Sequence, residues 1–265
     1  MDGIEDLKIY IDLQNTKKNN LDFEIQAFTR KFKPGDILIN KSPYRPRTLF
    51  KYYSPETYNL KALEEGKVWM SRPDNFNDPY DCAFKLRDDI NNLSMGQSLK
   101  SFKDRIAITC YSENSDSILM WSHYARNHQG FCVEYDFGDV SLLGPKHYDR
   151  NYSMILAPVI YGKRELIEIT NNQENDSYAI LKMVYSKAFD WIYEQEWRQV
   201  LITQQALNGG FLSPSADIKT IVLGCKIDSF VEKIIYRMCL EKGIKLEKMR
   251  MHEDKFFLER IGIIN

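Results

Sequence analysis

The sequence has no long hydrophobic run and no strong excess of charge of either sign. No stretch of about 18 apolar residues occurs, which excludes a conventional membrane-spanning helix. The 36 Lys and Arg nearly balance the 37 Asp and Glu, and a net charge of -1 argues against a protein that coats nucleic acid with its whole surface. The first residues also lack the basic-then-apolar profile of a secretory signal. We therefore expect a cytoplasmic protein.

Cysteine is scarce and has no informative spacing. The odd number of cysteines argues against a disulfide framework, and the four histidines have no zinc-ligand spacing with them. We expect buried, reduced thiols and no structural zinc. The five cysteines are Cys82, Cys110, Cys132, Cys225 and Cys239.

The common nucleotide and hydrolase motifs are absent as well. The sequence contains no Gly-x-Gly-x-x-Gly, no Gly-Lys-Ser/Thr phosphate loop, no His-Glu-x-x-His and no Gly-x-Ser-x-Gly. This excludes a Rossmann-type dinucleotide site, a phosphate-loop nucleotidase, a zinc-helix protease and an esterase of the nucleophile-elbow type.

What is present indicates a globular protein with its own core. The 265 residues are 43% hydrophobic and 28% charged. Strand and helix patterns mix without strict alternation, which predicts an α+β fold: a single domain with central, split antiparallel or mixed β-sheets flanked by helices. We expect an N-terminal capping region over residues 1–48 and one domain over residues 49–265.

The apolar pattern places these elements along the chain. Ser54 is expected to cap a helix that has Pro55 at its first position and stops near Gly66. Other helices are expected at residues 23–32, 116–126, 176–189 and 228–242. Strands are expected at residues 37–39, 49–53, 67–70, 106–111, 130–135, 157–161, 196–202, 218–223, 244–249 and 256–259.

Two strand-associated segments carry candidate binding groups. Lys51 and Tyr52 place a basic group beside aromatic rings, which can hold a phosphate or stack on a planar ring; a surface lysine beside core tyrosines is the simpler interpretation. Tyr111 and Ser112 end a strand, where a rigid scaffold presents functional side chains, although Ser112 also suits a turn.

The segment Tyr193-Glu194-Gln195-Glu196-Trp197-Arg198 is the strongest candidate for catalysis. On a strand, Glu194, Glu196 and Arg198 share one face. Two like charges on one face are unfavourable unless they are solvated, paired or used. The pattern therefore favours either an exposed ionic ladder or a catalytic carboxylate with a helper.

Two further segments have both structural and functional interpretations. Asn77 lies in the turn Phe76-Asn77-Asp78-Pro79-Tyr80, which packs its aromatics into the core or closes over a ligand. Trp121 and Tyr124 share a helix face and suit a core, whereas His123 points elsewhere and is free to line a cleft.

Together, three of these segments resemble a widespread bacterial family of unknown function. The resemblance rests on residues 76–80, on Met120-Trp121-Ser122-His123-Tyr124-Ala125 and on residues 193–198, and it runs from about Leu49 to Ile227. Some members of that family lie near phage-defence and toxin-like genes, which implies a toxin or defence protein with a toxin–antitoxin or defence-system partner.

The layout further resembles the ADP-ribosyltransferase superfold. This resemblance implies an NAD-consuming transferase that needs no recycled cofactor. Glu196 would stabilise the ribosyl cation, Glu194 would orient or deprotonate the acceptor, and Ser112 would hold Glu196. The remaining candidates would bind NAD: Lys51, Tyr52, Tyr111, Asn77, Trp121, His123 and Arg198. The acceptor, a protein or a nucleic acid, is left open.

Two other functions compete with the transferase. Asp78, Asp81, Glu134 and Asp136 offer carboxylates for Mg²⁺, with Lys85 nearby, as in a metal-dependent nuclease. The 13% aromatic content also suits a non-catalytic binding or antitoxin-like module.

Overall fold

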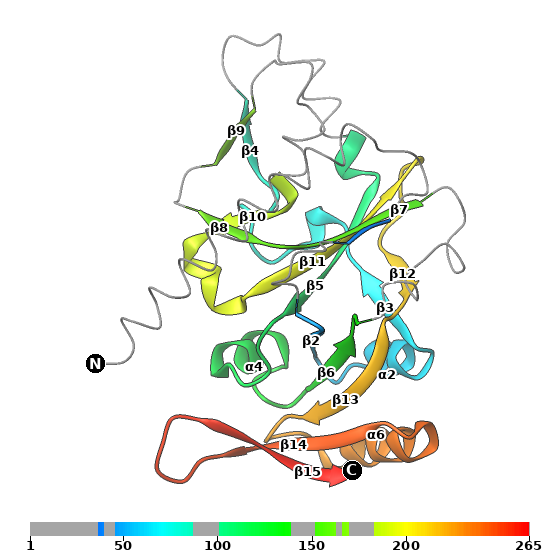
Figure 1. The fold of residues 1–265 in the computed structure, drawn as a ribbon, viewed down its shortest axis with the longest axis vertical. Coiled ribbons are helices and arrows are strands. Elements are labelled where there is room, and N and C mark those ends of the chain that lie inside the picture. Colours follow the sequence, from blue (N-terminus) through cyan, green and yellow to red (C-terminus); the bar gives the residue numbers. More distant parts are fainter. Residues whose placement is uncertain are drawn as a thin grey trace.

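One mixed sheet organises the protein in the computed structural model, which describes residues 37–39, 46–86, 101–138, 152–162, 166–169 and 183–264. The helix expected at residues 23–32, and most of the expected N-terminal capping region, lie outside these ranges. The expected α+β single-domain class is confirmed (Figure 1). Among the described residues, no helix is both long and apolar enough to span a membrane.

Among the described residues, the large sheet has nine strands. β1 pairs with β7, and β13 with β14, in parallel; the other neighbours are antiparallel. Their order is β1 (Ile37–Ile39), β7 (Tyr152–Pro158), β11 (Glu196–Thr203), β5 (Ile106–Ser112), β2 (Thr48–Tyr53), β6 (Phe131–Asp136), β13 (Asp217–Leu223), β14 (Lys245–Met251) and β15 (Leu258–Ile264).

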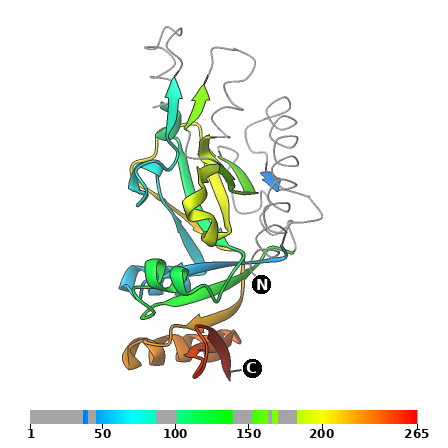
Figure 2. The same ribbon diagram turned by 90° about the vertical axis from the view of Figure 1, so that its left-hand side faces the viewer.

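The sheet is split at its middle. β2 and β5 share a single residue pair, Phe50 with Ser112, whereas β2 and β6 share six. Figure 2 shows the consequence: the strands on the β5 and β11 side run upright, and those on the β2 and β6 side run across them. The large mixed sheet is therefore continuous, but it is joined by one residue pair next to Ser112.

Three helices and three short ladders complete the described fold. The helices are α2 (Thr57–Glu64), α4 (Ile118–Tyr124) and α6 (Ser229–Lys242), with 3-10 turns η1 (Pro73–Asn75) and η3 (Phe189–Glu194). Asp228 caps α6 as predicted, by accepting hydrogen bonds from the N–H groups of Phe230 and Val231. The ladders are β3 (Lys67–Met70) with β12 (Phe211–Pro214), β8 (Ile160–Gly162) with β10 (Ser186–Ala188), and β4 (Phe84–Leu86) with β9 (Ile167–Ile169).

Two predicted helix boundaries are wrong. Helix α2 begins at Thr57 with Glu56 at its N-cap, and Ser54 instead accepts a hydrogen bond from the Asn59 amide. The helix predicted to reach residue 189 does not, because residues 186–188 form β10 and pair with β8. Tertiary pairing outweighs local helix propensity there.

The core consists of adjoining apolar clusters on both sides of the split. One cluster joins Tyr111, Leu156 and Trp197 to side chains of the other half of the sheet, including Leu49 and Tyr53. All five cysteines are free, as expected.

Candidate functional site

Five charged side chains meet inside the protein at the start of β11. They are Asp81, Lys187, Glu194, Glu196 and Arg198, and none of their side chains is more than 4% exposed. We call this group the charge cluster. It contains three acids and two bases. Burying charge is costly unless each group is paired, so the positions of the partners determine what the cluster can do.

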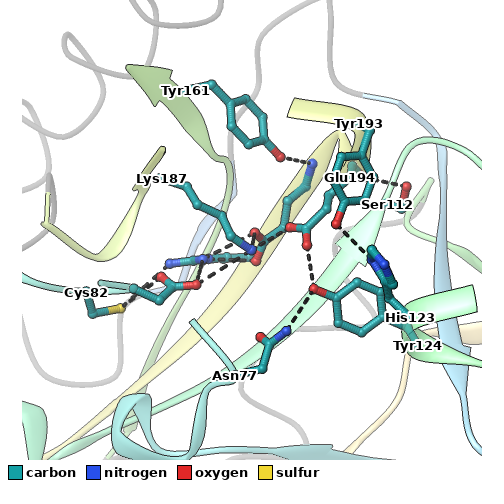
Figure 3. Close-up of polar contacts among 12 residues, drawn as sticks. Asn77, Cys82, Ser112, His123, Tyr124, Tyr161, Lys187, Tyr193 and Glu194 are labelled. Carbon is teal, nitrogen blue, oxygen red and sulfur yellow. Dashed lines mark hydrogen bonds and ion pairs between the residues drawn. The ribbon is translucent and has the colours of Figure 1, made fainter. Parts of the chain in front are cut away.

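Lys187 occupies the centre of the charge cluster (Figure 3). Its Nζ lies 2.5 Å from Oε2 of Glu194, 3.2 Å from Oε2 of Glu196 and 3.6 Å from Oδ2 of Asp81. The Trp191 ring centroid is 4.9 Å from the same nitrogen. Burial favours a neutral amine, but the carboxylates outweigh it and raise the pKa of Lys187. Lys187 is therefore a fixed cation shared by both glutamates.

Arg198 pairs with Glu196 on the side opposite to Lys187. Its Nε lies 2.7 Å from Oε1 of Glu196, and its Nη2 lies 2.8 Å from Oδ2 of Asp81. The guanidinium also donates to the Val184 carbonyl and lies over the Phe76 ring. Burial disfavours the ionised form of Glu196, yet Arg198 and Lys187 outweigh burial and hold the pKa of Glu196 well below its ordinary value.

Glu194 has a different environment. Burial and the neighbouring charge of Glu196 raise the pKa of Glu194 to about 7, against the opposite effect of Lys187. Two carboxylates from one short segment thus have very different proton affinities. Such a separation is the usual arrangement of an acid–base pair in an enzyme.

The backbone explains how the two glutamates come to share Lys187. Glu194 ends η3, Gln195 has left-handed dihedrals (φ 45°, ψ 52°), and Glu196 opens β11. Glu194 therefore lies outside the strand, and strand alternation is not what places it. The exposed ionic ladder is wrong, because Glu194 is 3% and Arg198 0% exposed. Arg198 forms its ion pairs with Glu196 and Asp81, and not with Glu194 as the strand spacing suggested.

A second layer of side chains connects Glu194 to the surface. Tyr124 Oη donates to Oε1 of Glu194 over 2.5 Å, and the Asn77 amide lies 3.5 Å from the same hydroxyl. His123 Nδ1 is 3.0 Å from the Tyr193 hydroxyl. Asn77 and His123 are exposed, whereas Tyr124 and Tyr193 are half-buried. We call these four residues the outer layer. Within it, Tyr124 and Asn77 give Glu194 a hydrogen-bonded path outward.

Ser112 and Lys51 lie at the margin of the charge cluster. The Ser112 hydroxyl donates to the main-chain carbonyl of Glu194 over 2.6 Å, and not to the Glu196 carboxylate as the resemblance implied. Lys51 Nζ donates to the Cys110 carbonyl over 3.3 Å, and burial lowers the pKa of Lys51. Ser112 thus positions the backbone of Glu194, and Lys51 is engaged by the main chain.

Three of the candidate NAD-binding residues lie in the apolar core. Tyr52 packs edge-on against Trp121, which is fully buried, with ring centroids 5.2 Å apart. Tyr111 is 2% exposed and donates to the Gln199 side chain. The structure does not bring these three together with the charge cluster. It does bring Asn77, His123, Glu194, Glu196 and Arg198 there.

Sequence reasoning missed Lys187 and did not connect Asp81 with the glutamates. Lys187 lies in the segment 176–189, which the sequence predicts to be a helix, and nothing in its local pattern distinguishes it. Tyr161, which accepts a hydrogen bond from the Glu196 N–H, was also missed. Tyr124 and Tyr193 lie within the segments 120–125 and 193–198, which carry the motif resemblance, so the sequence did point to these two residues.

The carboxylates of the alternative metal site do not assemble. Asp81 belongs to the charge cluster, Glu134 pairs with Lys219 and Arg260, and Asp136 pairs with Arg47. Within the described ranges, no group of three or more His, Cys, Asp or Glu side chains is placed to hold a metal ion.

Comparison with known proteins gives one family. Residues 120–199 match the family described as "Protein of unknown function (DUF2971)". This range includes the segments 120–125 and 193–198, whereas the turn at residues 76–80 lies outside it. No curated protein and no solved structure matches the chain.

Proposed function

We propose that the protein is an NAD-consuming, ADP-ribosyltransferase-like enzyme in which Glu194 is the acid–base carboxylate. The observation that carries the proposal is the unequal pairing of the two glutamates. Lys187 and Arg198 enclose Glu196, whereas Oε1 of Glu194 faces the Tyr124 hydroxyl and the outer layer. A carboxylate that titrates near neutral pH and leads to the surface suits proton transfer in an enzyme working near pH 7.

In this reaction, the residues of the charge cluster have distinct roles. The N-glycosidic bond between ribose and nicotinamide breaks, and nicotinamide leaves with the bonding electrons. The carboxylates of the charge cluster stabilise the positive charge that develops on the ribose. The acceptor's nucleophilic atom bonds to the ribosyl carbon, and its proton passes to Glu194. Lys187, Arg198 and Asp81 hold the glutamates in position.

NAD as the substrate, and a protein or nucleic acid as the acceptor, are supported by the motif resemblance alone. So is a role as a toxin or phage-defence protein. The proposal keeps the role that the resemblance implied for Glu194 and changes only that of Glu196, because Lys187 and Arg198 enclose the Glu196 carboxylate.

The test is nicotinamide release from NAD, with labelled NAD used to follow transfer into a cell extract. We expect Glu194→Gln to lower the rate by about 10²- to 10⁴-fold, since general acid–base catalysis contributes that much. The matched control is Glu241→Gln, an exposed glutamate of α6, which should leave the rate unchanged. Equal rates for wild type and Glu194→Gln would refute the assignment.

A binding measurement separates this enzyme from a non-catalytic module. A ligand that binds the folded state raises the melting temperature. NAD or ADP-ribose should therefore raise the melting temperature of both the wild type and Glu194→Gln. A binding or antitoxin-like module predicts no shift with either nucleotide.

A further inference from the structure

The turn between β14 and β15 presents large apolar side chains to solvent. Phe256 is 103% exposed and Met251 63%, and Phe257 next to it is 47% exposed. Ile118 and Leu119, at the start of α4, are also exposed. In Figure 1 this hairpin projects at the bottom of the molecule, below α4. Exposed aromatic side chains gathered in one place are typical of interaction surfaces.

A cavity lies beside the same turn. Its volume is about 430 Å³, within the range of pockets that bury a ligand. Apolar side chains from three parts of the chain make up much of its wall, namely Ile118, Cys225, Met251, Phe257 and Leu258, and Phe256 also borders it. The cavity and the exposed Phe256 thus belong to one continuous surface.

The border of the cavity carries charges of both signs. Lys226 and Lys255 are basic, Glu253 and Asp254 are acidic, and all four are exposed. None of them forms an ion pair with another residue that the structure describes. A partner that satisfies this surface must offer an apolar plug together with both signs of charge at the border.

We propose that this surface is the interface of a homodimer, in which Phe256 of each copy enters the cavity of the other. A two-fold axis puts the same patch on both sides of an interface, so a plug and a cavity that lie side by side on one copy face each other in the pair. The patch also carries charges of both signs, so each copy offers the other charges of the opposite sign. A second copy therefore supplies every complementary group.

The interface adjoins the charge cluster through α4. This helix begins at Ile118, on the proposed interface, and ends at Tyr124, which donates to Glu194. The dimer proposal does not depend on the proposed function, because only surface residues of the hairpin, of α4 and of the loop at residues 225–226 carry it.

The direct test is sedimentation equilibrium of the full chain over a wide concentration range. We expect a dimer for the wild type. Phe256→Asp should weaken dimerisation by about 30-fold or more, as loss of a central aromatic at an interface does. Leu240→Asp is the control, since Leu240 is also an exposed apolar residue but lies near the C-terminal end of α6, next to the start of β14 and not to its hairpin end. Thermal melts verify that both variants fold.

A charge exchange provides a second, independent measurement. The double variant Lys226→Glu with Lys255→Glu places like charges across the proposed axis and should dissociate the dimer. Adding Glu253→Lys and Asp254→Lys restores opposite signs and should restore dimerisation. A wild-type monomer at every concentration would overturn the proposal, as would a dimer that tolerates Phe256→Asp or a failure of the four-fold variant to recover.

Discussion

The Tyr124 hydroxyl donates a 2.5 Å hydrogen bond to Oε1 of Glu194, which joins a half-exposed helix residue to a buried carboxylate. On its other oxygen the same carboxylate contacts Lys187. Glu194 is therefore held between a permanent cation inside and a neutral donor outside. The pKa of Tyr124 is raised by burial and by Glu194, so the hydroxyl keeps its proton.

This relationship predicts the effect of Tyr124→Phe. The hydrogen bond stabilises the ionised form of Glu194, so its loss should raise the pKa of Glu194 above about 7. We expect the acidic limb of the rate–pH profile for NAD cleavage to move up by about one to two pKa units, since a hydrogen bond to a charged group contributes about 1.5–3 kcal/mol. Tyr80→Phe, at an exposed tyrosine of the neighbouring turn, should leave the profile in place. An unmoved limb in Tyr124→Phe would contradict this role.

Glu194 should also make stability depend on pH in an unusual direction. Its pKa is raised from 4.5 to about 7, so the folded state binds the proton more tightly than the unfolded state does. Its contribution to stability is complete below about pH 4.5 and is lost as pH rises through 7. At about 1.4 kcal/mol per pKa unit, the loss is on the order of 3 kcal/mol.

The measurement is urea unfolding of wild type and Glu194→Gln across pH 5 to 8. The free energy of unfolding of the wild type should fall relative to that of the variant over this interval. Parallel curves for the two proteins would show that Glu194 does not titrate there. Glu196 acts oppositely, because its pKa is lowered and its contribution is lost only as pH falls below about 4.5.

Truncation of Arg198 should be among the most damaging single changes. Arg198→Ala leaves Glu196 and Asp81 without their guanidinium partner in the interior. Breaking a buried pair in this way costs about 3–5 kcal/mol, measurable by chemical denaturation. Arg47→Ala removes a similar ion pair, with Asp136, at the surface and should have little effect. If both variants unfold alike, the charge cluster does not stabilise the fold.

Gln195 offers a test of backbone strain at the site. Left-handed dihedrals cost a residue with a Cβ roughly 1–2 kcal/mol, and glycine avoids this cost. Gln195→Gly should therefore unfold at an equal or higher denaturant concentration than the wild type. A β-branched residue suits this conformation least, so Gln195→Val should be destabilised by more than about 1 kcal/mol. The reverse order would show that the side chain of Gln195, and not its backbone, determines stability here.

The sequence predicts long elements and local motifs better than partnerships across the fold. Strand β11 and the Asp228 cap of α6 follow from apolar pattern and capping chemistry, and the structure has both. β10, β4 and β9 have only three residues each, too few to give a pattern against competing helix and loop signals. For this reason the sequence did not indicate that Lys187 belongs to the site.

The orientation of side chains on buried strands was the second obstacle. β5 is buried on both faces apart from the half-buried Cys110, so alternation could not tell which of Tyr111 and Ser112 faces the glutamates. Ser112 does so through the Glu194 carbonyl, and Tyr111 packs into the core. Asp81 reaches Arg198 across more than a hundred residues of sequence, a pairing that no local pattern encodes.

The single residue pair between β2 and β5 has a mechanical consequence. Main-chain hydrogen bonds contribute little to holding the two halves of the sheet together, so their relative angle depends on the side chains packed across the split, Tyr111 and Trp197 among them. Shrinking one of these aromatics would allow one half to rotate against the other, and would not merely leave a void. The geometry around Ser112 and Glu194 therefore depends on core residues that lie outside the charge cluster.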